Sequence, residues 1–229
     1  MMMDKTTALS TMVEQIPNGA TIMVSGFGSS GTPFTLIDEL LNQGQSQLTL
    51  IKNDANETSI GIDKLIAKGR VKKLIATHIG LNPLAMELAE SNQLAVELVP
   101  QGILAERIRA AGIGVKGFLS TIGLGTDYEQ LREKITIGDE TVLFEPAIFA
   151  DVALIHAEKA DTFGNAQFNT AGVNFAPLMA MAAKLTLLEC KSLVGIGQIA
   201  PPQVHMSGVV VNHVAKINHL SQDYEPIKR

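Results

Sequence analysis

Residues 18–33 read NGATIMVSGFGSSGTP, and this stretch decides the fold. An apolar segment, predicted as a strand over 20–25, runs into a loop with three glycines, and Pro33 closes that loop. Glycines let the backbone pass close to a bound group, and a helix that follows directs its unpaired N–H groups toward that group. The stretch therefore predicts a strand, an anion-binding loop and a helix.

Apolar, β-rich runs alternate with helix-period runs through the first half of the chain. The predicted strands cover 20–25, 48–52, 73–77 and 94–99, and the predicted helices cover 34–43, 57–68, 84–91 and 103–111. The strands are apolar without polar alternation, which is typical of a parallel sheet covered by helices on both faces. This order predicts an α/β layered domain with a largely parallel sheet.

In the second half of the chain the regular alternation of strands and helices is interrupted. Beyond residue 112, glycines divide the chain into short segments, which predicts a small mixed β lobe. The α/β pattern then resumes with a strand at 151–157, a hairpin turn at 161–165, a helix near 175–183 and a strand at 185–189. We expect a single domain over residues 1–229, ending in a polar tail from Ser221 that is a loose end or a partner contact.

Composition excludes several classes of function. The formal net charge is -5 and the chain has no tryptophan, so neither a basic surface nor stacking platforms indicate nucleic-acid binding. The basic cluster at 68–73 is interpreted as a solvated surface beyond a helix end. Cys190 is the only cysteine, which favours a reducing, cytoplasmic location, and no apolar run reaches the roughly 18 residues needed to span a membrane.

The glycine loop also satisfies G-x-G-x-x-G over Gly26–Gly31, with Asp54 placed further along as the acidic residue of a dinucleotide site. A nicotinamide-dependent oxidoreductase is therefore one hypothesis. However, Thr32 and Pro33 predict that the helix begins after the loop, whereas the third glycine of that fingerprint lies in the first helical turn. The loop also lacks the Lys-Ser/Thr ending of a P-loop. A structural tight turn remains the third interpretation.

The pattern resembles the signature of family I coenzyme A transferases: Asn/Asp-Gly, three apolar residues, then Gly-Gly-Phe-x-x-x-Gly-x-Pro. Ser25 stands where the family usually has the first glycine. The resemblance continues through residues 48–54, 69–73, 99–109 and 123–126. It covers nearly the whole chain and is closest to the α (A) subunits of bacterial acetate/acetoacetate and 3-oxoacid transferases.

This resemblance implies how the chain would work. The family's nucleophile is a glutamate in a Ser-Glu-Asn-Gly segment of the β subunit, and that segment does not occur here. The resemblance therefore implies a β-subunit partner in an α2β2 assembly, coenzyme A as a substrate, and no permanently bound cofactor. A non-catalytic regulatory subunit on the same fold is a further hypothesis.

The resemblance assigns Gln101 to oxyanion stabilisation, for which a neutral amide with two N–H donors is suited. Gly26, Phe27, Gly28 and Gly31 are expected to line the carboxylate pocket. Phe27 is expected to form an apolar wall there, with a buried core position as the alternative. Asn53 follows the second predicted strand and is expected beside the loop, where its amide orients the substrate carboxylate or forms an Asx turn.

Other candidates carry weaker signals. The five histidines show no metal-ligand spacing, so no metal site is expected, and His78 is interpreted as a structural histidine near the crevice. Glu106, Arg107 and Arg109 are expected to form exposed or interface ion pairs. Glu145 precedes a proline and has no other mark of a nucleophile. Relatives carry Arg-x-x-Ala-Arg-Asn-Phe at the position of residues 169–175, where this chain lacks both arginines. The preferred substrate is therefore expected to differ from that of the relatives.

Overall fold

The computed structural model describes residues 3–219 and 221–224. Its helices are α1 (Leu9–Val13), α2 (Phe34–Gln43), α3 (Ile62–Ala67), α4 (Pro83–Glu90), α5 (Gln101–Gly112) and α6 (Ala176–Ala182). Its strands are β1 (Thr21–Val24), β2 (Leu48–Ile51), β3 (Val71–Ala76), β4 (Ala95–Leu98), β5 (Gly117–Ser120), β6 (Glu133–Ile137), β7 (Glu140–Pro146), β8 (Ala150–Asp161), β9 (Ala166–Gln167), β10 (Ala183–Val194) and β11 (His213–Lys216). Short 3-10 turns connect several of them.

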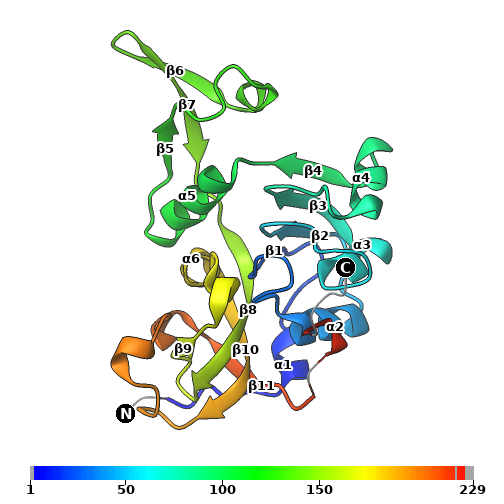
Figure 1. The fold of residues 1–229 in the computed structure, drawn as a ribbon, viewed down its shortest axis with the longest axis vertical. Helices are drawn as coiled ribbons and strands as arrows, with labels where there is room; N and C mark the ends of the chain where they lie inside the picture. The colour runs from blue at the N-terminus through cyan, green and yellow to red at the C-terminus, as the bar shows by residue number, and fades with distance from the viewer. Residues whose placement is uncertain (1–2, 220, 225–229) are drawn as a thin grey trace.

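The large sheet has the order β11-β10-β8-β1-β2-β3-β4, and every pairing along this path is parallel. Strand β9 adds an antiparallel hairpin to β8. Helices lie on both faces, with α1 to α4 on one side and α5 and α6 on the other (Figure 1). The predicted α/β fold with a largely parallel sheet is confirmed.

Residues of β1 show how the sheet is buried on both faces. Ile22 and Val24 pack in the cluster beneath α1 to α4, whereas Met23 packs in the cluster beneath α5 and α6. All three side chains are fully buried. Because successive side chains of a strand point to opposite faces, a strand between two helical layers must be apolar at every position.

A three-stranded antiparallel sheet, β5-β7-β6, forms the predicted β lobe. The lobe projects away from the large sheet, and the long strand β8 follows it back into the core (Figure 1). The turn predicted at 161–165 is also present, because one oxygen of Asp161 accepts from the backbone N–H groups of Phe163, Gly164 and Asn165. That turn joins β8 to β9.

Several predicted boundaries were wrong. The helix expected at 57–68 begins only at Ile62, because Asn56 and Ser59 adopt left-handed backbone angles, φ 58° and 68°. Asn56 Oδ1 then accepts from the Ile62 N–H at 3.1 Å, which satisfies one donor of the first helical turn. The strand expected at 151–157 extends over the whole of β8, and α1 and β11 were missed.

The polar tail starts as an ordered contact. Tyr224 packs edge-on against Phe34 with ring centroids 4.8 Å apart, and Asp223 forms an ion pair with Lys64 at 2.6 Å. Residues 221–224 are thus held against α2 and α3, which excludes a loose end for this part. The prediction for residues 225–229 lies outside the described residues.

Candidate active site

The carboxyl ends of β1, β2, β3 and β4 meet at one edge of the large sheet. Strand register places Met23 beside Ile51, and Ile75 beside both Ile51 and Glu97. The segments that follow these strands are therefore neighbours: the glycine loop, residues 52–56, residues 77–79 and the start of α5. This is the edge at which open α/β sheets bind ligands.

The glycine loop adopts a conformation that its sequence requires. Gly26 and Gly31 have φ of 104° and 75°, and a Cβ on Gly31 would lie 2.5 Å from backbone atoms of Gly172. Ser25, the position that departs from the family pattern, donates from Oγ to the Gly31 carbonyl at 2.7 Å. Its hydroxyl also accepts from the His156 N–H at 3.2 Å. Ser25 therefore closes the base of the loop.

Asp54 holds the other side of the loop. Its Oδ2 accepts from the Gly28 N–H at 2.8 Å, and its Oδ1 accepts from the Asn56 N–H at 2.9 Å. Lys52, which is fully buried, donates to Asp54 Oδ1 at 3.1 Å and to the Gly28 carbonyl at 3.3 Å. Both polar atoms of the Gly28 peptide are thus bound by this buried ion pair.

The ion pair changes the acidity of both partners. Burial alone would raise the pKa of Asp54, but the Lys52 ammonium and the hydrogen bonds from Gly28, Asn53 and Asn56 lower it to about 2. Burial lowers the pKa of Lys52, and the Asp54 carboxylate opposes that effect. The carboxylate is the form that the loop requires, because both of its oxygens accept hydrogen bonds.

The anion predicted for the loop and the following helix is supplied by the chain itself. Asp54 occupies the Gly28 N–H, and Glu189 Oε2 accepts from Leu36 N at 2.7 Å in the first turn of α2. Asp54 is only 4% exposed and is engaged on both oxygens, so it has no free oxygen to bind a ribose. The geometry therefore argues against the dinucleotide hypothesis.

Asn53 and Gln101 are brought together across β3. Asn53 is buried, and its Oδ1 accepts from Gln101 Nε2 at 2.9 Å, while its Nδ2 donates to Asp54 Oδ2 at 3.1 Å. The Asn53 amide thus contacts neighbouring side chains, and the Asx turn weighed for this position is formed by Asp54 with Asn56 N. Gln101 is exposed at the first residue of α5, and its second Nε2 hydrogen has no acceptor among the described residues.

A cavity of about 370 Å³ lies against the loop. Phe27, Gly28, Ser29 and Ser30 form its loop wall, and His78 and Leu81 stand among the residues that complete it. Phe27 is 45% exposed, so its alternative as a core residue is wrong. His78 is exposed and lines this cavity, so it lies near the crevice as expected.

Charged residues elsewhere have structural partners. Arg107 donates from Nε to the Pro146 carbonyl at 2.7 Å and from Nη1 to Glu97 at 3.2 Å, so it forms an ion pair as predicted, but the side chain is buried and not exposed. Glu106 and Arg109 do form an exposed ion pair at 2.8 Å. Glu145 is fully buried, with Arg132 Nε at 2.9 Å and the Tyr128 hydroxyl at 2.8 Å. These contacts give Glu145 a structural role at the lobe.

Lys52 and Asn56 are the residues of the site that sequence analysis missed. Both side chains reach the Gly28 carbonyl, at 3.3 Å and 2.9 Å. A lysine directly after the strand residues Leu-Thr-Leu-Ile and two positions before an aspartate was the available signal, because such a pair at a strand end points the same way. Within the described residues no group of three or more His, Cys, Asp or Glu side chains is arranged to hold a metal.

A model of the coenzyme A transferase family matches residues 6–216. The chain belongs to the coenzyme A transferase family. It is 44% identical over 197 residues to the acetate CoA-transferase subunit alpha of Escherichia coli K12, covering 86% of this chain and 90% of that protein. It is also 44% identical to the acetoacetyl-CoA:acetate/butyrate CoA transferase alpha subunit of Clostridium acetobutylicum, covering 87% of this chain and 91% of that one.

Solved structures share the fold of this coenzyme A transferase. A thioester complex of an acyl-CoA transferase from E. coli O157:H7 with CoA matches 98% of this chain with a TM-score of 0.84 and 27% identity. The chain spans 49% of the length of that protein. Glutaconate coenzyme A-transferase from Acidaminococcus fermentans matches 93% of this chain and 75% of its own, with a TM-score of 0.80 and 21% identity, which shows the fold alone.

Proposed function

We propose that this chain is the α subunit of a two-subunit coenzyme A transferase. It works with a β subunit to move CoA between an acyl-CoA and a short-chain carboxylate or 3-oxoacid of the acetate/acetoacetate type. The single observation that carries the proposal is the position of the Gln101 amide at the carboxyl edge of the sheet. One of its N–H groups donates to Asn53, and the other has no acceptor among the described residues. The names of the relatives, which are alpha subunits acting on acetate, acetoacetate or butyrate, support the substrate class.

The proposed reaction passes through two covalent intermediates on a glutamate of the β subunit. Its carboxylate attacks the thioester carbonyl and expels the CoA thiolate, which leaves an acyl–glutamyl anhydride. The thiolate then attacks the glutamyl carbonyl and releases the first acid as a carboxylate, which leaves a glutamyl–CoA thioester. The acceptor acid reverses these two steps. Each attack places negative charge on a carbonyl oxygen.

Gln101 is proposed to donate its free N–H to that oxygen. Asn53 holds the amide by its other hydrogen, so the donor is oriented before the charge forms and no reorganisation is needed. Asp54 holds Asn53 in turn, and Lys52 neutralises Asp54. In this arrangement Gln101 contacts the reacting atoms, whereas Asn53, Asp54 and Lys52 are positioning residues.

The loop residues are proposed to shape the acid pocket. Gly28 keeps the backbone close to the substrate, and the exposed ring of Phe27 forms an apolar wall of the 370 Å³ cavity. Of the other predicted pocket residues, Gly26 is buried at the base of the loop and Gly31 lines a neighbouring cavity. A wall of this kind suits a short acyl chain, because burying a methylene is worth about 0.8 kcal/mol. Coenzyme A is a substrate in this scheme and no permanent cofactor is required.

Purification of this chain together with the product of the adjacent reading frame tests the proposal. The complex is expected to transfer CoA from acetoacetyl-CoA or butyryl-CoA to acetate, and this chain alone is expected to show no transfer. A Ser-Glu-Asn-Gly segment in the partner supports the assignment of the nucleophile. Absence of transfer across a panel of short carboxylates contradicts the proposal.

A further inference from the structure

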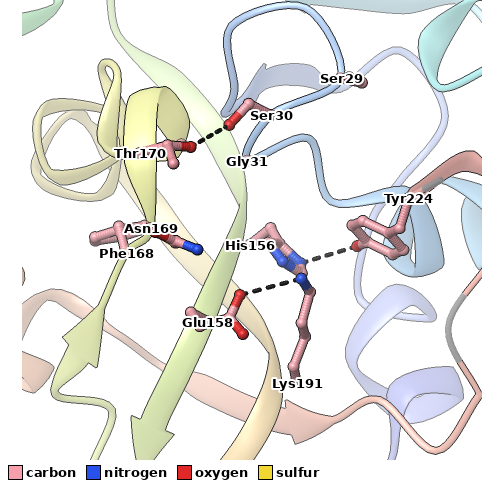
Figure 2. Close-up of a pocket in the computed structure, with 11 residues that line it drawn as sticks. Ser29, Ser30, Gly31, His156, Glu158, Phe168, Asn169, Thr170, Lys191 and Tyr224 are labelled. Carbon is pink, nitrogen blue, oxygen red and sulfur yellow. Dashed lines mark hydrogen bonds and ion pairs between the residues drawn. The ribbon is translucent and has the colours of Figure 1, made fainter. Parts of the chain in front are cut away.

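A second cavity borders the glycine loop and is shown in Figure 2. It measures about 240 Å³ and shares Ser29 and Ser30 with the Phe27 cavity, but its other lining residues are different. Asn169 and Thr170 form the facing wall, and Ser30 Oγ lies 3.0 Å from Thr170 Oγ1 across it. At about 30 Å³ per water molecule, the cavity holds a group of several heavy atoms.

His156 on β8 lines this cavity and is only 6% exposed. Its Nδ1 lies 2.8 Å from Oε1 of Glu189, which is fully buried on the neighbouring strand β10. Tyr224 also donates its hydroxyl to Glu189 Oε1, and Leu36 N donates to Oε2. Burial and the Glu189 carboxylate raise the pKa of Tyr224, so its hydroxyl keeps its proton. The Tyr224 oxygen also lies 2.8 Å from His156 Nδ1 (Figure 2), so the three side chains contact one another.

This arrangement determines which nitrogen of His156 carries the proton. Because the Tyr224 proton is directed to Glu189, the two oxygens next to Nδ1 both act as acceptors there. In the neutral ring Nδ1 is therefore the N–H side, and Nε2 keeps its lone pair. Nε2 makes no hydrogen bond to any residue that the structure describes. A buried ring thus presents an unused acceptor to the cavity.

The remaining polar groups define the chemistry of a ligand. Lys191, the cation at the cavity, is paired with Glu158 at 3.1 Å. The Asn169 amide nitrogen extends from the facing wall in the direction of His156 (Figure 2). A carboxylate would face Glu158 and the Nε2 lone pair, and the one lysine among the described lining residues is already paired. A hydroxyl fits, because it donates to His156 and accepts from Asn169.

We propose that this second cavity is a subsite for a hydroxyl group of the acid substrate, so that the enzyme prefers a short hydroxycarboxylic acid to the unsubstituted acid. The inference rests on the proposed function, since the acid must first bind beside the glycine loop. A site built to hydrogen-bond a substrate hydroxyl discriminates against an analogue that lacks it, because its polar groups are then left unpaired.

Rates of CoA transfer by the complete two-subunit complex test this preference. The acceptors are butyrate and its 2-, 3- and 4-hydroxy derivatives, with acetyl-CoA as donor. At least one hydroxy acid is expected to exceed butyrate in kcat/KM by about ten-fold, which corresponds to one hydrogen bond of about 1.4 kcal/mol. A complex that transfers CoA to butyrate but shows no such preference overturns the subsite and leaves the proposed function intact. A complex that transfers to no acid overturns the proposed function instead.

Two variants assign the preference to this cavity. His156→Phe keeps an aromatic ring beside Tyr224 and is expected to lower the ratio of hydroxy acid to butyrate about ten-fold. Because that variant removes a partner of buried Glu189, its thermal unfolding is measured as well. Asn169→Ala changes an exposed residue with no side-chain hydrogen bond to a described residue, and it is expected to lower the ratio about three-fold.

Asn42→Ala is the matched control, since Asn42 is exposed on α2 and takes no part in either cavity. It is expected to leave the ratio unchanged. If Asn169→Ala leaves the ratio unchanged as well, the proposal is wrong. If it instead raises the KM for acyl-CoA equally with every acid, the cavity binds the hydroxyl of the CoA pantetheine arm, and the assignment to the acid is overturned.

Discussion

Two networks of buried charged side chains differ in the residues to which they lead. At the glycine-loop edge, the Lys52–Asp54 ion pair leads through Asn53 to Gln101, which is exposed and keeps one unused N–H. At the junction with the antiparallel lobe, Glu97 and Glu145 are met by Arg107 and Arg132 at 2.9–4.0 Å. Those side chains face one another.

The difference teaches that a buried charge by itself does not mark a site. Both networks perturb acidity strongly: the pKa of Asp54 and that of Glu97 are each lowered to about 2, in both cases against the effect of burial. Burial and Glu145 also raise the pKa of Tyr128 to about 12. Only the first network ends on a neutral donor at the ligand-binding edge of the sheet. The Gln101 N–H without an acceptor is therefore the feature that distinguishes the site from the structural network.

Removal of one carboxylate from either network has the largest expected effect. Asp54→Ala leaves buried Lys52 without its carboxylate, and Glu145→Ala leaves buried Arg107 and Arg132 sharing Glu97 alone, so each is expected to lower the free energy of unfolding by about 3–5 kcal/mol. Urea unfolding of each variant measures this loss. A loss below about 1 kcal/mol in either one would show that water reaches that network.

Gln101→Ala tests whether the glycine-loop network, unlike the network at the lobe, contributes to the turnover rate. In the complete complex it is expected to lower kcat by about 10²–10³, because one oxyanion donor is lost. The free energy of unfolding is expected to fall by only about 1 kcal/mol, because the exposed side chain gives up one hydrogen bond to Asn53. Gln203→Ala, an exposed glutamine far from the loop in sequence, serves as the control with unchanged kcat. Wild-type turnover in Gln101→Ala would instead favour a non-catalytic subunit.

The dependence of stability on acidic pH distinguishes the two networks further. The pKa of Asp54 is about 2 in the folded chain against 3.8 for the free side chain, so its contribution is fully present above pH 3.8 and is lost as the pH falls through 2. The expected loss is about 2 kcal/mol. Unfolding between pH 2 and 6 measures it, and Asp54→Asn is expected to flatten the curve below about pH 4. An equally steep curve in that variant would assign the acid response to Glu97 and its neighbours.

The exposed pair of Glu106 and Arg109 gives the smallest expected effect. Both side chains are nearly half exposed, so Glu106→Gln is expected to change the free energy of unfolding by no more than about 0.5 kcal/mol. Thermal unfolding at low and high salt checks this. A larger loss would place the pair against a partner surface in the assembly.

The parallel sheet could be predicted from the sequence because apolar runs and glycine turns are local signals. Sequence reasoning also placed Asn53 and Gln101 at the same edge, since the carboxyl ends of parallel strands meet there. Sequence reasoning could not determine the direction of the Asn53 side chain, which depends on a contact with Gln101, 48 residues away in the chain. Likewise, Arg107 has a surface pattern in sequence, and only the lobe that folds over it buries the side chain.

None of the helices in the described part of the chain has the length and apolar character needed to cross a bilayer. The cytoplasmic location, the single domain over residues 1–229 and the α2β2 assembly stay predictions. The assembly is the most directly accessible of the three, because the complex needed for the activity measurements can be sized in the same preparation.

The doubly held Gly28 peptide has a consequence for assembly. Its N–H is bound by Asp54 and its carbonyl by Lys52, Asn56 and Thr32, so the loop has little conformational freedom left to lose when another subunit docks. Ordering a flexible residue costs about 1–2 kcal/mol of backbone entropy, and that cost is met here during folding. Association of the two subunits can therefore proceed as the docking of preformed surfaces.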